Sequence, residues 1–185
     1  MRIIAGMYRS RVLTAPEGLR TRPTSDRLRE TLVNVLAPRI EGAAFLDLYA
    51  GSGAVGMEAL SRGAAHATFV ERSAAALTVL RGNMERLGIG HEARVRAQSV
   101  SAFLRAAKKE RYDIVFLDPP YDEANEYATT LGLLGGVAGA ILAADAIVAA
   151  EHRRKLVLEE RHGNLKRTRL LEQGDAALTF YAAIP

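Results

Sequence analysis

The chain of 185 residues contains no cysteine. Disulfides, thiolate metal sites and a cysteine nucleophile are therefore excluded, and the composition fits a reducing compartment. No apolar run approaches the roughly 18 residues of a membrane span, because Asp145 and several glycines interrupt the most apolar region, residues 131–150. No leading apolar stretch resembles a signal peptide. We therefore expect a cytoplasmic protein that does not contact a membrane.

Acidic residues are scarce where basic ones gather. Residues 1–30 hold seven arginines and three acidic residues, a net charge of +4 that equals the excess of the whole chain. This placement is typical of an arm that meets a polyanion such as nucleic acid. Arginine is also the default cation here, with 21 arginines against 4 lysines, so charge alone leaves an ordinary solvated surface open. The four histidines are isolated and show no metal-ligand spacing, so we predict no metal site.

The length and the ordinary globular composition, 49% hydrophobic and 25% charged, predict one domain, or one domain with an appendage. The alternation of apolar and polar residues over 2–14, with a bend at residues 6–10, predicts a β-hairpin. Thr24 or Ser25 would cap a helix that runs to about residue 36, is stopped by Pro38, and turns Arg29 away from its apolar face. We therefore divide the chain into an N-terminal extension, residues 1–40, and a main domain, residues 41–185.

From residue 45 onward strand and helix patterns alternate, which predicts a mostly parallel, doubly wound sheet. The expected strands are residues 45–48, 67–71, 93–97, 113–117 and 147–151, and the expected helices are residues 54–62, 73–87, 100–109 and 123–134. Two further runs, residues 165–172 and 176–182, flank Gly174-Asp175 and predict an antiparallel hairpin. A parallel sheet that ends in such a hairpin is characteristic of S-adenosylmethionine-dependent methyltransferases with a Rossmann-like fold.

A glycine turn follows the first expected strand. Gly51-x-Gly53-x-x-Gly56 matches the fingerprint of a dinucleotide-binding turn, and Glu71 follows about 20 residues later, where an acid would bind a ribose hydroxyl. Glycines let the backbone approach a ligand, and the helix N-terminus offers unpaired N–H groups. The turn predicts an adenosine-bearing cofactor without deciding which one.

The second informative stretch is Asp118-Pro119-Pro120-Tyr121, at the carboxyl end of a buried strand. An Asp carboxylate beside a carbonyl that prolines hold rigidly makes a pair of acceptors, and an aromatic ring follows at stacking distance. This set suits a planar –NH2 group on a base, whose nitrogen it could orient for attack on a sulfonium methyl. Taken alone, the same four residues could form only a rigid turn.

Together these stretches resemble the RsmD family of bacterial methyltransferases, which modify the N2 amine of a guanine in 16S ribosomal RNA. The resemblance spans the chain: Arg2-Ile-Ile-Ala-Gly6 and Gly18-Leu-Arg-Thr-Arg-Pro-Thr24 at the start, the glycine turn and Asp118-Pro-Pro-Tyr121 in the middle, and Gly174-Asp-Ala-Ala-Leu-Thr-Phe-Tyr181 at the end. It implies S-adenosylmethionine as the cofactor.

The resemblance also implies roles for individual residues. The cofactor would be held by Asp47, Tyr49, Gly51, Ser52, Gly53, Glu71, Arg72 and Ser99, although many methyltransferases have Asp where this chain has Ser99. The flipped target base would be held by Asp118, Pro119 and Tyr121. The RNA would be contacted by Arg9, Arg11, Arg20, Arg22 and Thr24. The expected partner is 16S rRNA within a partly assembled small subunit, with the enzyme acting as a monomer.

Three other functions fit parts of the sequence. A methyltransferase of another substrate, N6 of adenine in DNA or RNA or a protein amide, would use the same motif, although proteins that methylate glutamine amides usually carry Asn at the Asp118 position. A nicotinamide-dependent oxidoreductase would use the glycine turn, but the Asp118 motif and the terminal hairpin oppose it. A non-catalytic RNA-binding module would require the intact cofactor turn to be vestigial.

Overall fold

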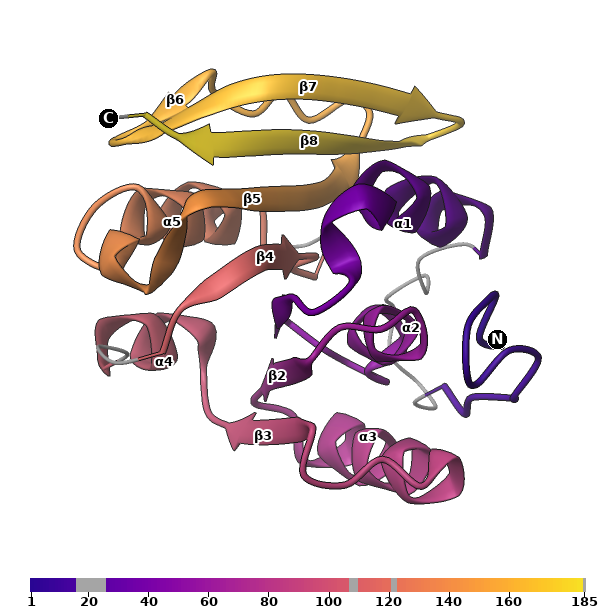
Figure 1. The fold of residues 1–185 in the computed structure, drawn as a ribbon. Coiled ribbons are helices and arrows are strands. Elements are labelled where there is room, and N and C mark those ends of the chain that lie inside the picture. The colour runs from indigo at the N-terminus through magenta and orange to yellow at the C-terminus, as the bar shows by residue number, and fades with distance from the viewer. Residues whose placement is uncertain (16–25, 107–109, 121–122, 185) are drawn as a thin grey trace.

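The computed structural model of the chain describes residues 1–15, 26–106, 110–120 and 123–184 (Figure 1). Arg20, Arg22, Thr24 and Tyr121, which the sequence assigns to RNA and base contacts, lie outside these residues, as does the expected helix cap at Ser25. Within the described ranges, no helix is long and apolar enough to cross a membrane.

The centre of the molecule is an eight-stranded sheet with the order β3-β2-β1-β4-β5-β8-β7-β6. The neighbours from β3 to β5 pair in parallel, and β8 and β7 then add antiparallel, so the predicted sheet and its terminal hairpin are confirmed. The strands are β1 (Ala44–Leu48), β2 (His66–Glu71), β3 (Ala93–Ala97), β4 (Tyr112–Leu117), β5 (Leu142–Arg153), β6 (Arg161–His162), β7 (Leu165–Gln173) and β8 (Ala176–Ala183).

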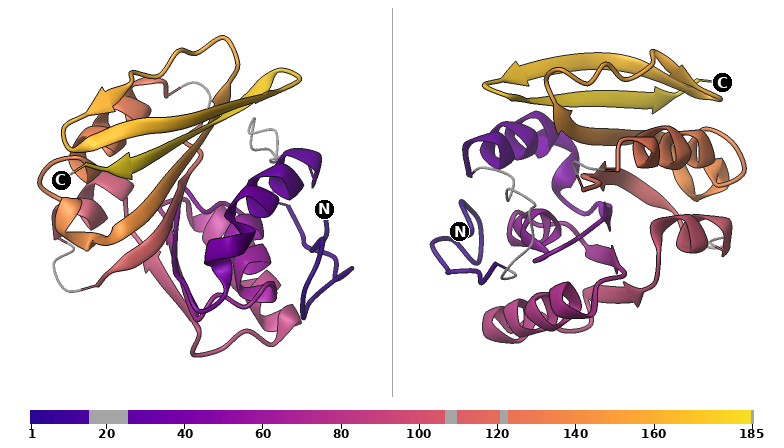
Figure 2. Two further views of the ribbon diagram at one scale, coloured as in Figure 1. Left: turned by 45° about the horizontal axis from the view of Figure 1, so that its top comes forward. Right: turned by 180° about the vertical axis from the view of Figure 1, so that it is seen from behind.

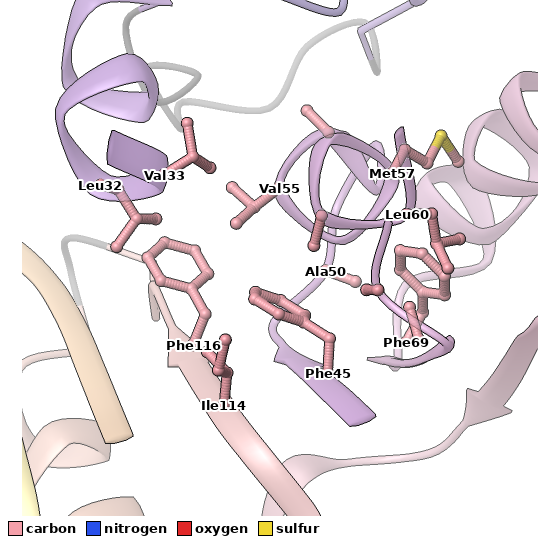
Figure 3. Packing of buried hydrophobic residues seen from close by; sticks show 14 of the residues in the cluster. Leu32, Val33, Phe45, Ala50, Val55, Met57, Leu60, Phe69, Ile114 and Phe116 are labelled. Atoms are coloured by element: carbon pink, nitrogen blue, oxygen red, sulfur yellow. The ribbon is translucent and has the colours of Figure 1, made fainter. Parts of the chain in front are cut away.

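Helices cover both faces of this sheet (Figures 1 and 2). On one face lie α1 (Asp26–Ile40), α2 (Ala54–Ser61) and α3 (Ala74–Leu87), whose apolar residues share one core with the strands. Figure 3 shows part of this core, where Phe45, Phe69 and Phe116 of three strands point toward the helices. The opposite face carries α4 (Val100–Ala106), α5 (Asn125–Leu134) and a short 3-10 helix, η1 (Gly139–Ile141).

Helix α1 departs from the sequence prediction in two ways. It continues through Pro38 to Ile40, where Arg39 ties its last turn to the carboxylate of Asp145 at 2.6 Å. Pro38 has no N–H and so removes one intrahelical hydrogen bond, and only two residues of the helix follow it. In addition, Arg29 is fully buried rather than turned away from the core.

Strand β5 is longer than the five residues predicted from the sequence. Its first residue, Leu142, pairs with Tyr112, and Ile147–Arg153 pair with β8. The Ala-rich residues of its first half have low intrinsic β propensity, so the sequence pattern does not mark them as a strand, and the Leu142–Tyr112 pair lies at its start.

The N-terminal arm, residues 1–15, follows the path of the predicted hairpin but pairs regularly only at an Arg2–Val12 bridge. A buried acid fixes it to the body, because the Glu58 carboxylate accepts hydrogen bonds from the amides of Ile4 at 2.8 Å and Ala5 at 3.1 Å. The guanidinium of Arg29 lies 3.9 Å from the same carboxylate. The extension therefore packs directly on the main domain.

Candidate active site

The predicted site residues meet where the parallel strands end. Leu48 of β1 pairs with Val70 of β2 and with Leu117 of β4. The residues that follow, Tyr49 and Asp118, therefore occupy equivalent positions at the carboxyl ends of neighbouring strands. Glu71 ends the strand on the other side of β1. Ligands of open α/β sheets bind at this edge.

The glycine turn between β1 and α2 requires its glycines. Gly51 and Gly53 have φ angles of +55° and +79°, and the Gly53 amide donates to the Ala50 carbonyl at 2.8 Å. A Cβ on Gly53 would lie 2.3 Å from Leu80 Cδ1, and one on Gly56 would lie 2.4 Å from Phe69 Cε1. Left-handed backbone and close packing therefore both exclude side chains here.

Asp47 lies beneath this turn, with 2% of its surface exposed. Its Oδ2 accepts a hydrogen bond from the Gly56 amide at 2.9 Å. Burial raises the pKa of the Asp47 carboxyl to about 8; the bond from Gly56 partly offsets this, and the negative charge of Glu71 adds to it. A buried carboxyl of this kind suits a cationic group of a ligand.

Glu71 organises the backbone around it. One carboxylate oxygen accepts from the Gly51 amide at 2.9 Å, and the other accepts from the amides of Arg72 at 2.8 Å and Ser73 at 2.7 Å. An ionised carboxylate has about four acceptor positions, so a ribose diol could still share it. Ser52, within the turn, offers its carbonyl to Asn83 Nδ2 at 3.0 Å.

Tyr49 and Arg72 both reach toward α5 instead of the glycine turn. The Tyr49 hydroxyl donates to Glu126 Oε2 at 2.7 Å and lies 2.6 Å from Thr130 Oγ1. Burial is the main cause that raises the pKa of Tyr49. Arg72 Nη2 donates to Glu123 Oε1 at 2.6 Å. If Tyr49 contacts a cofactor, it must therefore do so through its ring or backbone.

Sequence reasoning missed the three α5-side partners, Glu123, Glu126 and Thr130. They lie in or just before a helix whose pattern indicates only amphipathicity, and they meet residues more than 50 positions away. No local signal in the sequence could have identified them.

Asp118 directly follows β4 and is half-buried, while Pro119 is buried. The carbonyl of Pro120 accepts a hydrogen bond from the Glu123 amide at 2.8 Å. Asp118 and the two prolines thus follow β4 at the strand end next to the one that leads into the glycine turn.

The remaining described candidates lie at the margin of the site. Ser99 follows β3, and its hydroxyl accepts from the Ala102 amide at 3.3 Å in the first turn of α4. Arg9 and Arg11 are exposed on the N-terminal arm. In the part of the chain that is described, no group of three or more His, Cys, Asp or Glu residues could hold a metal ion.

Comparison with known proteins identifies the family. A family model described as Conserved hypothetical protein 95 matches residues 1–182. Ribosomal RNA small subunit methyltransferase D of Escherichia coli (strain K12) is 49% identical over 121 residues, which cover 65% of this chain and 60% of that protein. The chain belongs to the RsmD family. The predicted family is therefore confirmed.

Two further matches extend over nearly the whole RsmD-family chain. YlbH of Bacillus subtilis (strain 168), named as a candidate rRNA methyltransferase, is 37% identical over 183 residues, 98% of each chain. The solved structure of yhhF from Escherichia coli, described as a candidate methyltransferase, superposes with a TM-score of 0.85 at 40% identity and covers 99% of this chain and 97% of that one. The Rossmann-like methyltransferase fold is thus confirmed from end to end.

Proposed function

We propose that this RsmD-family chain transfers a methyl group from S-adenosylmethionine to the exocyclic N2 amine of a guanine in 16S rRNA. The observation that carries the proposal is the register of β1 and β4, which brings the glycine turn and Asp118 to adjacent strand ends. The names of the relatives support rRNA as the substrate.

The groups around the glycine turn fit the cofactor chemically. The buried carboxyl of Asp47 suits the ammonium of the methionine moiety, and the remaining acceptor position of Glu71 suits a ribose hydroxyl. Gly51, Ser52 and Gly53 would pass close to the methionine end, and Ser99 would lie near the adenine. When bound, the cofactor supplies an electrophilic methyl group on a sulfonium.

Asp118 and the Pro119 carbonyl would accept the two N–H bonds of the flipped guanine's amine. This orients the nitrogen lone pair and favours the tetrahedral geometry that an in-line attack needs. The carboxylate also stabilises the positive charge that develops on the nitrogen. Tyr121 would stack on the base and contribute roughly 1–3 kcal/mol, which offsets much of the cost of unstacking it from RNA.

The N-terminal arm would hold RNA beside this pocket. Asn83 links the two, since it bonds both to Thr14 of the arm and to the Ser52 carbonyl of the cofactor turn. Arg9 and Arg11 on the arm, with Arg20, Arg22 and Thr24, would contact phosphates more than bases. The partner would be 16S rRNA in a partly assembled small subunit, approached by a single copy of the chain.

Replacement of Asp118 by Ala tests the catalytic assignment. We expect methylation of small-subunit RNA lacking this modification to fall at least 100-fold, because positioning and charge stabilisation are both lost. Binding of S-adenosylhomocysteine should survive. Asp145→Asn is the matched control, because Asp145 pairs with Arg39 at the start of β5, away from the site.

Nucleoside mapping of small-subunit RNA from cells with and without the chain tests the product. N2-methylguanosine should disappear without it. If N6-methyladenosine is instead the nucleoside that is missing from cells without the chain, the chain is an adenine methyltransferase. If the two RNA samples contain the same modified nucleosides, the proposal is refuted.

A further inference from the structure

Two side-chain contacts connect the cofactor strands to the segment that follows the Asp118 motif. Tyr49, immediately after β1, bonds to Glu126 in the first turn of α5. Arg72, immediately after β2, bonds to Glu123. Both are contacts between side chains and not backbone hydrogen bonds of the sheet. They therefore connect the ends of β1 and β2 to α5 and to the residues just before it.

Backbone bonds continue both contacts to the proposed base site. The Glu123 amide donates to the Pro120 carbonyl at 2.8 Å, and the Glu126 amide donates to the Glu123 carbonyl at 2.9 Å. Tyr49 is therefore connected to Pro120, two residues after Asp118, by three successive hydrogen bonds that involve Glu126 and Glu123. The position of α5 and that of the Asp118 segment are fixed together.

The Tyr49 end of this path is itself well determined. Tyr49 adopts a φ of +64°, a left-handed conformation that non-glycine residues rarely take. Its single hydroxyl hydrogen goes to Glu126, so the Thr130 hydroxyl, which is buried, must donate to the Tyr49 oxygen. The phenol is thus satisfied as both donor and acceptor, and it has one position.

We propose that Tyr49 is a positioning residue for the target-base site: through Glu126 it holds α5, and with it Asp118–Pro120, in register with the strands that bind the cofactor. This role rests on the proposed function, in which the methyl group and the amine must meet in line. The sequence resemblance assigns Tyr49 to the cofactor; the contacts assign its hydroxyl to the substrate side instead.

The test is Tyr49→Phe, which keeps the ring and removes only the hydroxyl. Because a misplacement of about 1 Å can cost on the order of 100-fold in rate, we expect kcat to fall about 10- to 100-fold at saturating cofactor. The affinity for S-adenosylhomocysteine should change less than about threefold. Tyr181→Phe is the control, because it removes the hydroxyl of another buried tyrosine, which bonds to the Glu159 carbonyl away from the site.

Variants of the partner separate positioning from general destabilisation. Glu126→Gln keeps an acceptor oxygen for the phenol and should retain most of kcat, whereas Glu126→Ala should match Tyr49→Phe. The double variant Tyr49→Phe/Glu126→Ala should be no slower than the slower single variant, since one contact is removed twice. An unchanged kcat in Tyr49→Phe, or a loss confined to cofactor affinity, would overturn the proposal.

Hydrogen exchange gives a readout that does not need turnover. Amides of Asn125–Leu134 should exchange faster in Tyr49→Phe than in the native chain or in Tyr181→Phe, and those of β7 should not change. Equal exchange in α5 would refute the positioning role even if the RNA substrate were wrong. Conversely, if the native chain methylates no RNA but α5 still exchanges faster in Tyr49→Phe than in the native chain, only the proposed function is refuted.

Discussion

Replacement of Asp47 by Asn should abolish a proton release that accompanies cofactor binding. Asp47 is buried beside the Gly56 amide, and its pKa is raised to about 8. At pH 7 the carboxyl of the free protein is therefore about 90% protonated. An arriving ammonium group stabilises the ionised form and lowers such a pKa by about 1–3 units. Binding at pH 7 should then release somewhat less than one proton.

The pH dependence of affinity follows with a definite sign. Below pH 8 the protein must ionise Asp47 before or during binding, so the affinity for S-adenosylhomocysteine should rise by up to about tenfold per pH unit from pH 6 and level off near pH 8. Folding is linked in the opposite sense. The raised pKa means that the folded chain holds a proton the unfolded chain has lost, so this contribution to stability declines as pH rises toward 8.

Titration calorimetry in two buffers with different ionisation enthalpies measures the proton directly. The apparent binding enthalpy of the native chain should differ between phosphate and Tris at pH 7, whereas that of Asp47→Asn should not. Glu71→Gln should shift the release to lower pH, because the charge of Glu71 contributes to the raised pKa. Buffer-independent enthalpies for the native chain would refute the assignment of Asp47 to the ammonium.

Two stability predictions concern the framework of the site. Gly53→Ala should lower the free energy of unfolding by about 2–5 kcal/mol, because the backbone is left-handed and the new Cβ would lie 2.3 Å from Leu80. A Cβ on Gly51 would meet no atom closer than 4.0 Å, so Gly51→Ala should cost only the backbone part, about 1–2 kcal/mol. Equal midpoints of urea unfolding for the two variants would contradict the packing argument. Glu58→Ala should cost about 3–5 kcal/mol, because it leaves the amides of Ile4 and Ala5 without their acceptor and removes the fully buried carboxylate beside Arg29. Among the described residues, the buried Arg29 guanidinium would keep only its 3.0 Å contact with Asp26 as an ion pair. The control Glu30→Ala replaces an exposed acid of α1 and should change the free energy of unfolding, measured by urea titration, by no more than about 0.5 kcal/mol. A similar loss of stability in both variants would show that the buried Glu58 does not fix the arm to the body.

The sequence predicted most of the fold because its periodicity is strong where the sheet is buried. The expected strand 93–97 has the bounds of β3, and the expected helix 54–62 differs from α2 by one residue. What it missed depended on partners distant in the chain. Buried Arg29 contacts the Arg2 carbonyl of the arm and lies beside Glu58 of another helix, and β5 extends to Leu142, which pairs with Tyr112 of β4.

The candidate site divides in the same way. Gly53 and Asp118 could be predicted because residues next to them in the sequence indicate their roles. A positive φ favours glycine, and prolines after an acid indicate rigid acceptors. The contact from Tyr49 to Glu126 could not, because it joins side chains 77 positions apart and neither residue stands out locally. Side chains that support a site are therefore harder to predict than the backbone turns that form it.

The two outer edges of the sheet have a consequence for how copies of the chain meet (Figure 1). Unpaired edges invite strand addition from another molecule, and charged side chains along an edge discourage it. On β3, the outermost strand on one side, Arg94 and Arg96 alternate and share Glu110 at 3.1 Å and 2.9 Å. The other side ends in β6, whose two residues pair only with Leu165 and Lys166 of the longer strand β7. Of the two borders, the charged β3 edge is therefore the one that discourages strand addition by another copy.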